Sequence, residues 1–319
     1  MRDVRGNGVR TEDFAENGFL VLPGFLPGGL VERLLPEVDR WVETGWRQQS
    51  IDAVRPGAGA PETVELDLEA HGELAAYPPL LDLLGSADLL GGSFVFHHLH
   101  SDRRPAGGTG KNWHHDYEQR PQRDRRLPMV HALHYIGGLR PEAGGLAVLP
   151  GSHREVAEKN ARDHLGTAVL PGEVLIDELP PGSTVLLHSA LFHTRRAAPS
   201  ARAGHRYMID GSYCRTGTRW PPVKPYWRQV LAVGRARGLD AGHPDLFAER
   251  HFSTYETAAA AAVGGAVTSA AGAVTSVGVA AAAGVTASAS AGATGAGAAM
   301  AARATGAGVG AATVGRRGA

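Results

Sequence analysis

Five short runs of residues between glycine- and proline-rich turns constrain the fold of this chain most strongly. They cover residues 93–100, 129–136, 146–149, 184–188 and 206–213. Short runs at such spacing, bounded by turns, are typical of strands in an antiparallel sandwich or barrel. Apolar residues at helical spacing precede them, over residues 30–42 and 79–90. The sequence therefore predicts a mostly β or α+β fold.

The C-terminal part of the chain has a different composition from the rest. Residues 257–319 are almost wholly Ala, Gly, Ser, Thr and Val, and they contain no aromatic residue, no acidic residue, no Leu and no Ile. Such a segment has too little apolar surface to offset the conformational entropy that ordering would cost. We predict a globular domain over residues 1–256, followed by a disordered, low-complexity Ala/Gly-rich tail over residues 257–319.

The charge balance and the cysteine content exclude several classes of protein. The chain has 32 basic and 32 acidic residues, so it carries no basic footprint for nucleic acid. Cys214 is the only cysteine, which excludes an internal disulfide framework and a cysteine-based zinc cluster. The charged N-terminal residues lack the apolar core of a secretory signal, and the uncharged part of the tail is too rich in Gly and Ser for a membrane span. These features predict a cytoplasmic protein that binds neither nucleic acid nor membrane, and they say nothing about its oligomeric state.

Most of the 15 histidines lie between residues 97 and 205, and one group has metal-ligand spacing. If the segment Trp-His-His-Asp-Tyr at residues 113–117 is a strand, His114 and Asp116 share one face and His115 points to the other. One further histidine would complete the two-His, one-carboxylate triad of non-haem Fe(II) sites. His193, much further along the chain, follows a predicted strand and is the candidate.

An arginine follows this histidine at the start of the next predicted strand. It is Arg206, which begins the last strand-like run, where its guanidinium is suited to hold a carboxylate bidentately. Spacing alone leaves a plainer alternative open, because a His-x-Asp pair in a histidine-rich chain is also consistent with an ordinary hydrogen-bonded pair. In that alternative Arg206 is a surface residue.

Other histidines in the strand-like runs are interpreted as structural. Strict alternation over residues 93–100 predicts one strand face formed by Phe94, Phe96, His98 and His100. In the next run, His131 and His134 are read as packed side chains, with a substrate contact as the alternative for His131.

Four motifs follow one another in a characteristic order. They are Gly-Phe-Leu-Val-Leu-Pro-Gly-Phe-Leu at residues 18–26, Trp-His-His-Asp at 113–116, Gly-Gly-Leu-Ala-Val-Leu-Pro-Gly-Ser-His-Arg at 144–154, and Gly-Ser-Thr-Val-Leu-Leu-His at 182–188. This order resembles the phytanoyl-CoA dioxygenase family of Fe(II)/2-oxoglutarate-dependent oxygenases, over about residues 14–215. The resemblance implies a double-stranded β-helix, a jelly-roll or cupin-like core with flanking helices.

The resemblance also implies an activity. Fe(II) would be bound by three catalytic residues, His114, Asp116 and His193, with 2-oxoglutarate and O2 as cosubstrates. The protein would hydroxylate a small organic substrate, namely a secondary metabolite, an amino-acid-like compound or an acyl compound, and release succinate and CO2. Hydroxylation is favoured over halogenation because related halogenases have a small residue in place of the carboxylate. Two alternatives stay open: a zinc-dependent hydrolase or isomerase with the same ligands, and a catalytically silent jelly-roll that binds a ligand.

For the cosubstrate, the resemblance implies three binding residues. Arg206 would hold the distal carboxylate of 2-oxoglutarate, and His115 and Leu99 would lie near the cosubstrate. The spacing from His193 to Arg206 is slightly longer than the family pattern, which makes Arg202 the competing clamp. Arg206 is favoured because it begins the strand-like run.

Overall fold

The computed structural model describes residues 11–105, 107–119, 127–198, 204–240 and 242–256. All of these residues belong to one structural unit, Met1–Gly264. The predicted tail at residues 257–319 and Arg202 lie outside the described residues. In the part of the chain that is described, no helix combines the length and the hydrophobicity needed to cross a bilayer.

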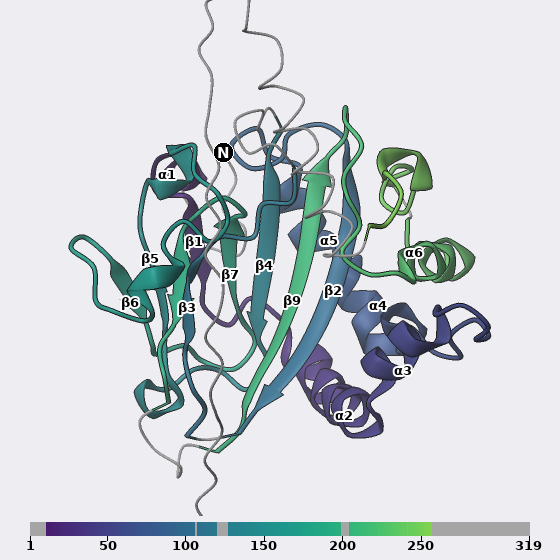
Figure 1. Cartoon of the computed structure of the whole chain (residues 1–319), viewed down its shortest axis with the longest axis horizontal. Coiled ribbons are helices and arrows are strands. Elements are labelled where there is room, and N and C mark those ends of the chain that lie inside the picture. The colour runs from purple at the N-terminus through teal and green to yellow at the C-terminus, as the bar shows by residue number, and fades with distance from the viewer. Residues whose placement is uncertain (1–10, 106, 120–126, 199–203, 241, 257–319) are drawn as a thin grey trace, which may run out of the picture. The chain divides into compact units, whose positions relative to one another are not determined.

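Two antiparallel sheets form the core of this unit (Figure 1). The larger sheet has the order β1 (Phe19–Leu22), β7 (Ser183–His188), β4 (Met129–Tyr135), β9 (Arg206–Arg215) and β2 (Phe94–Arg104). The smaller sheet has the order β3 (Lys111–His114), β8 (His193–Arg195), β5 (Leu146–Val148) and β6 (Val174–Ile176). Except for β5 and β6, neighbouring strands are not consecutive in the chain, as in a jelly roll. The predicted α+β fold with a double-stranded β-helix core is confirmed, and the five predicted strand runs become β2, β4, β5, β7 and β9.

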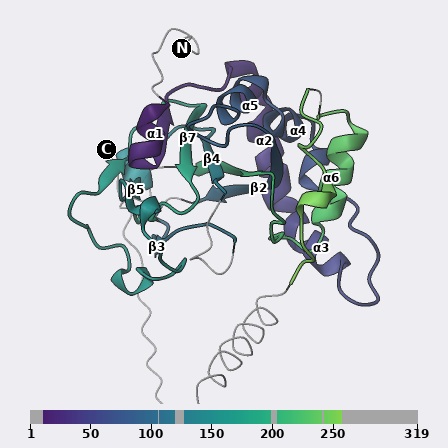
Figure 2. The same cartoon turned by 90° about the horizontal axis from the view of Figure 1, so that it is seen from above.

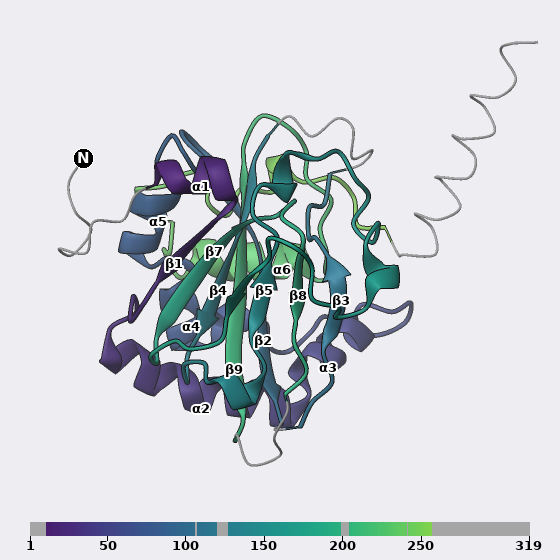
Figure 3. The same cartoon turned by 90° about the vertical axis from the view of Figure 1, so that its left-hand side faces the viewer.

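The helices flank the sheets. They are α1 (Glu12–Asn17), α2 (Gly28–Thr44), α3 (Trp46–Ala53), α4 (Glu69–Ala75), α5 (Pro78–Leu84) and α6 (Trp227–Ala236). Seen from above, α2 to α6 lie on one side of the larger sheet, and β3 and β5 lie on the other side (Figure 2). Seen from the left-hand side of Figure 1, β5, β8 and β3 lie side by side (Figure 3). The larger sheet is therefore covered by helices on its outer face and by the smaller sheet on its inner face.

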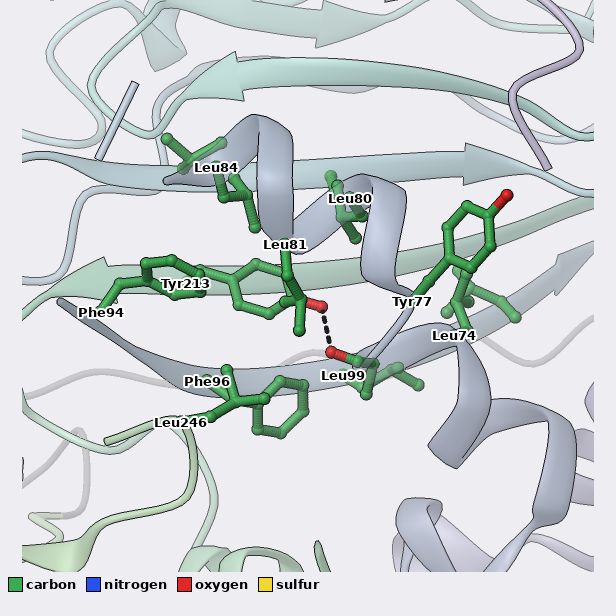
Figure 4. Close-up of a cluster of buried hydrophobic side chains, with 14 of the residues drawn as sticks. Leu74, Tyr77, Leu80, Leu81, Leu84, Phe94, Phe96, Leu99, Tyr213 and Leu246 are labelled. Atoms are coloured by element: carbon green, nitrogen blue, oxygen red, sulfur yellow. Dashed lines mark hydrogen bonds between the residues drawn. The ribbon is translucent and has the colours of Figure 1, made fainter. Parts of the chain in front are cut away.

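The outer face of the larger sheet is apolar and packs against the helices (Figure 4). Tyr213 lies in this layer, and its hydroxyl donates to the Ala75 carbonyl at 2.8 Å. Leu99 lies in the same layer, although strict alternation predicted His98 and His100 on the face of the phenylalanines. The register between β2 and β9 shifts between Phe96 and His98, and such a bulge reverses the alternation beyond it. That part of the face prediction was wrong, because His98 and His100 turn to the inner face.

The inner face of the larger sheet is apolar toward β7 and polar toward β2. Side chains from both sheets form the apolar half: Leu133, Tyr135, Val185 and Leu187 from the larger sheet, and Leu146, Val148 and Ile176 from the smaller one. Nearer β2, the inner positions are taken by histidine, aspartate, serine and arginine. Buried polar groups need hydrogen-bond or ligand partners, so this polar half of the inner face is the candidate ligand-binding region.

A buried ion pair ties the C-terminal segment to the short helical turn at Glu65–Asp67, and a hydrogen bond ties it to β2. Lys224 is 5% exposed and pairs with Glu65, which is 1% exposed, and its ammonium also donates to the Leu99 carbonyl. We expect Lys224→Met to lower the free energy of unfolding by about 3–5 kcal/mol, because it leaves a buried carboxylate unpaired. Urea unfolding followed by circular dichroism measures this. The double variant Lys224→Met/Glu65→Leu should recover most of the loss, and an unchanged single variant would refute the argument.

Candidate metal centre

The three predicted metal ligands converge between β3 and β8. His114 ends β3 and is the register partner of His193, which begins β8. Asp116 follows in the loop, where its backbone N–H donates to the Ser189 carbonyl at 2.7 Å. One carboxylate oxygen lies 3.2 Å from His193 Nε2, and the other lies 3.7 Å from His114 Nε2. One ligand atom from each residue thus lies within 4.8 Å of the others.

Backbone carbonyls orient both imidazoles toward the carboxylate. His114 Nδ1 donates to the Asn112 carbonyl at 2.6 Å, and His193 Nδ1 donates to the Leu191 carbonyl at 3.0 Å. Because each Nδ1 donates to a carbonyl, each ring presents its Nε2 atom to the carboxylate, as a metal-binding imidazole does. His114 Nε2 is buried and has no hydrogen-bond partner among the described residues. This orphaned lone pair fits a metal ligand better than an ordinary hydrogen-bonded pair.

The protonation states also suit a divalent cation. Burial and, as the next largest cause, the neighbouring charge of His193 together lower the pKa of His114 to about 3. Burial alone would raise the pKa of Asp116, but the hydrogen bond and charge of His193 hold that pKa well below its usual value. A neutral imidazole and an ionised carboxylate are the forms that bind metal. The Asp116 side chain is 26% exposed, so a small ligand can reach the centre.

A second set of donors lies at one end of the interior. Arg206 begins β9 and is 7% exposed, and its guanidinium carbon lies 5.3 Å from the centroid of the Tyr135 ring. One of its nitrogens donates to the Gly144 carbonyl at 3.3 Å. The Tyr135 hydroxyl is buried and has no partner among the described residues. A guanidinium and a phenol that both offer N–H or O–H donors are suited to a carboxylate.

The sequence reasoning missed a further arginine at this end. Arg195 lies two residues after His193 on β8 and so shares its face. It lines a pocket of about 120 Å³ together with Arg104 and Arg206. Burial and the charges of these two arginines lower the pKa of Arg195. The period-two spacing from His193 is the sequence signal that could have identified Arg195. The three arginines concentrate positive charge in a pocket suited to an anion.

Two predicted cosubstrate residues do not lie with this set. His115 packs its ring against Phe192 at 5.1 Å, its Nε2 donates to the Ala157 carbonyl at 3.0 Å, and its Nδ1 accepts from the Tyr117 N–H at 3.3 Å. Backbone groups thus engage both ring nitrogens. Leu99 lies in the helix-covered outer layer because of the bulge in β2. The structure thus places both side chains away from Arg206 and Tyr135, and their role in cosubstrate binding stays a prediction.

Comparison with known proteins agrees with this geometry. A family model described as phytanoyl-CoA dioxygenase matches residues 14–203. EctD from S. alaskensis, solved with 2-oxoglutarate and 5-hydroxyectoine, is similar at 19% identity and a TM-score of 0.52, over 69% of this chain and 80% of that one. The epimerase SnoN, solved with Fe3+, alpha ketoglutarate and nogalamycin RO, is similar at 19% identity and a TM-score of 0.51, over 66% of this chain and 84% of that one. A comparison with curated proteins gives no match. The chain belongs to the phytanoyl-CoA dioxygenase family of Fe(II)- and 2-oxoglutarate-dependent oxygenases.

Proposed function

We propose that the protein is a dioxygenase that hydroxylates a small organic substrate, such as a secondary metabolite, an amino-acid-like compound or an acyl compound. The observation that carries the proposal is the convergence of His114, Asp116 and His193, with two carbonyl-oriented imidazoles and an ionised carboxylate between them. Two histidines and one carboxylate leave three coordination positions open on a non-haem iron. Those positions accommodate a chelating cosubstrate and dioxygen.

The chain's own residues divide the work between two ends of the site. His114 Nε2, His193 Nε2 and an Asp116 oxygen hold Fe(II). Bound iron supplies the oxygen chemistry in which 2-oxoglutarate is decarboxylated to succinate and the substrate is oxidised. Arg206 holds the distal carboxylate of 2-oxoglutarate, and the Tyr135 hydroxyl donates a hydrogen bond to the same carboxylate. The buried guanidinium fixes the orientation of the cosubstrate through charge-assisted hydrogen bonds.

The charge at the cosubstrate end favours an oxygenase over the other two functions. A zinc hydrolase with the same three ligands has no need of Arg206 and Arg195 beside the metal, whereas a dicarboxylate cosubstrate needs a cationic partner for its second carboxylate. The complete ligand set argues against a silent binding protein. Asp116 fills the position that a halide would need, so we propose hydroxylation as the reaction.

Anaerobic spectroscopy tests this function without knowledge of the substrate. We expect addition of Fe(II) and then 2-oxoglutarate to produce a visible metal-to-ligand charge-transfer band, because the cosubstrate chelates the iron. Zn(II) in place of Fe(II), and succinate in place of 2-oxoglutarate, serve as controls and should give no band. A folded, iron-loaded protein that gives no band with 2-oxoglutarate would overturn the proposal.

A further inference from the structure

A second group of polar side chains lies on the inner face of the larger sheet. Asp210 follows Arg206 on β9, on the same face and about 13 Å along the strand. His131 on β4 and His98 on β2 lie beside it, and one ligand atom of each lies within 4.8 Å of the others. Burial lowers the pKa of His131, but the charges of Asp210 and, more weakly, Asp116 raise it overall. The group thus faces the same interior as the metal centre, but its residues come from the larger sheet, whereas His114 and His193 come from the smaller one.

Within the described part of the chain, hydrogen bonds hold the carboxylate of Asp210 by one oxygen only. His131 Nδ1 donates to Asp210 Oδ1 at 2.8 Å. Burial would raise the pKa of Asp210, but the charge and hydrogen bond of His131 bring it to about 2, so the group is ionised. Among the described residues the nearest charged or titratable partner of Oδ2 is His98 Nε2, at 3.9 Å. The Asp210 side chain is 16% exposed, so part of it is open to solvent.

Hydrogen bonds determine which nitrogen of His98 carries the proton. His97 Nε2 lies 2.8 Å from the Pro221 carbonyl, which only accepts, so this nitrogen is the protonated one. Burial lowers the pKa of His97 to about 4 and that of His98 well below its usual value, so both rings are neutral. His97 Nδ1 is therefore an acceptor that needs a proton donor. Its two neighbours there are Ser212 Oγ at 3.1 Å and His98 Nδ1 at 3.2 Å.

Every arrangement in which His97 Nδ1 receives a hydrogen bond places the proton of His98 on Nδ1. If Ser212 gave its proton to His98 Nδ1, at 2.7 Å, His97 Nδ1 would have no donor. If Ser212 gives its proton to His97 instead, His98 Nδ1 donates to Ser212 Oγ. If His98 Nδ1 donates a hydrogen bond directly to His97 Nδ1, it again carries the proton. The lone pair of His98 Nε2 therefore faces Asp210 Oδ2, and two acceptors converge.

Resting on the function proposed above, we propose that Asp210 and His98 bind a protonated amine of the substrate. One ammonium nitrogen has three donors, so it can bond to both acceptors at about 2.8–3.0 Å each and carries the charge opposite to Asp210. A hydroxyl has a single proton and would satisfy only one of the two. The distance along β9 from Arg206 to Asp210 places this subsite beyond the reach of the five-carbon cosubstrate. The substrate class is thus a small amine-bearing molecule.

A second metal ion fits the same atoms less well. The proton on His131 Nδ1 already bonds to Asp210 Oδ1, which removes that nitrogen as a ligand. His98 Nε2, Asp210 Oδ2 and the buried His131 Nε2 would remain, but Asp210 raises the pKa of His131 and so favours its protonated ring, which is not a metal ligand. Metal stoichiometry separates the two cases, since this inference requires one iron per chain.

Calorimetric titration with matched probes tests the subsite. Cyclohexylamine and cyclohexanol are titrated into the anaerobic protein with Fe(II) and 2-oxoglutarate, and also into the metal-free protein. We expect the amine to bind at least tenfold more tightly than the alcohol. Asp210→Asn should weaken amine binding by about 10- to 100-fold and leave alcohol binding unchanged. The control is Asp102→Asn on β2, whose carboxylate has the same 16% exposure but pairs with Arg104; it should keep the amine preference.

The outcomes separate this inference from the proposed function. Equal binding of amine and alcohol, or an unchanged amine affinity in Asp210→Asn, overturns the subsite even if the charge-transfer band forms. A second bound metal ion that Asp210→Asn removes also overturns it. Absence of the band in the wild-type protein overturns the oxygenase function instead, and the metal-free titration still decides the amine preference. The band in Asp210→Asn shows that the variant is folded.

Discussion

Asp116→Ala will leave the protein folded but unable to retain Fe(II), and 2-oxoglutarate turnover will fall to background. The substitution removes the only carboxylate of the three predicted ligands and leaves two imidazoles with ring centroids 4.3 Å apart. Loss of an outer-shell partner of a ligand typically costs about 10- to 100-fold in metal affinity, so loss of the ligand itself should cost at least about 100-fold. Iron per chain after dialysis and succinate release measure the two effects.

Another aspartate provides the matched control for this experiment. Asp82 is exposed on α5, and Asp82→Ala should retain wild-type iron content and turnover. Circular dichroism distinguishes loss of metal from loss of fold in the Asp116 variant. Full turnover in folded Asp116→Ala would show that the metal lies elsewhere.

Two members of the candidate metal triad were predictable together because their geometry follows from local rules. Period-two alternation alone places His114 and Asp116 on one side and His115 on the other, and the structure agrees. His193 needed the family motifs, since nothing in the sequence fixes which distant strand pairs with β3. The five strand runs and the jelly-roll class were likewise predictable, from turns and alternation for the runs and from the family motifs for the class. The division of the strands between two sheets was not predictable, because it depends on pairing between strands that are far apart in the sequence.

Alternation failed where the backbone departs from regular pairing. The bulge between Phe96 and His98 moves Leu99 into the helix-covered layer and turns His98 inward. A bulge of this kind has no glycine or proline signal here, so the sequence could not reveal it. The amine subsite was hidden for a second reason, because β2, β4 and β9 each supply one residue. Only their pairing brings His98, His131 and Asp210 together.

Arg206→Gln will raise the KM for 2-oxoglutarate by about 30-fold or more, because truncating one partner of a buried charge pair costs about 2–5 kcal/mol. Arg206 is 7% exposed, so water cannot take over its role. Arg206→Lys keeps the charge but loses the bidentate geometry and should recover part of the affinity. The titration of the charge-transfer band with 2-oxoglutarate measures this directly, while iron content should stay at the wild-type level.

Neighbouring residues make this result specific. Arg104 shares the pocket, but its guanidinium already pairs with Asp102 at 2.6 Å; Arg104→Gln should therefore change the KM far less. Tyr135→Phe removes one neutral donor and should raise the KM by about tenfold. If Arg206→Gln leaves the KM unchanged and Arg202→Gln raises it, the competing arginine is the clamp. If only Arg206 responds, the distal carboxylate lies beside Tyr135, and the metal centre and Arg206 then define the two ends of the cosubstrate.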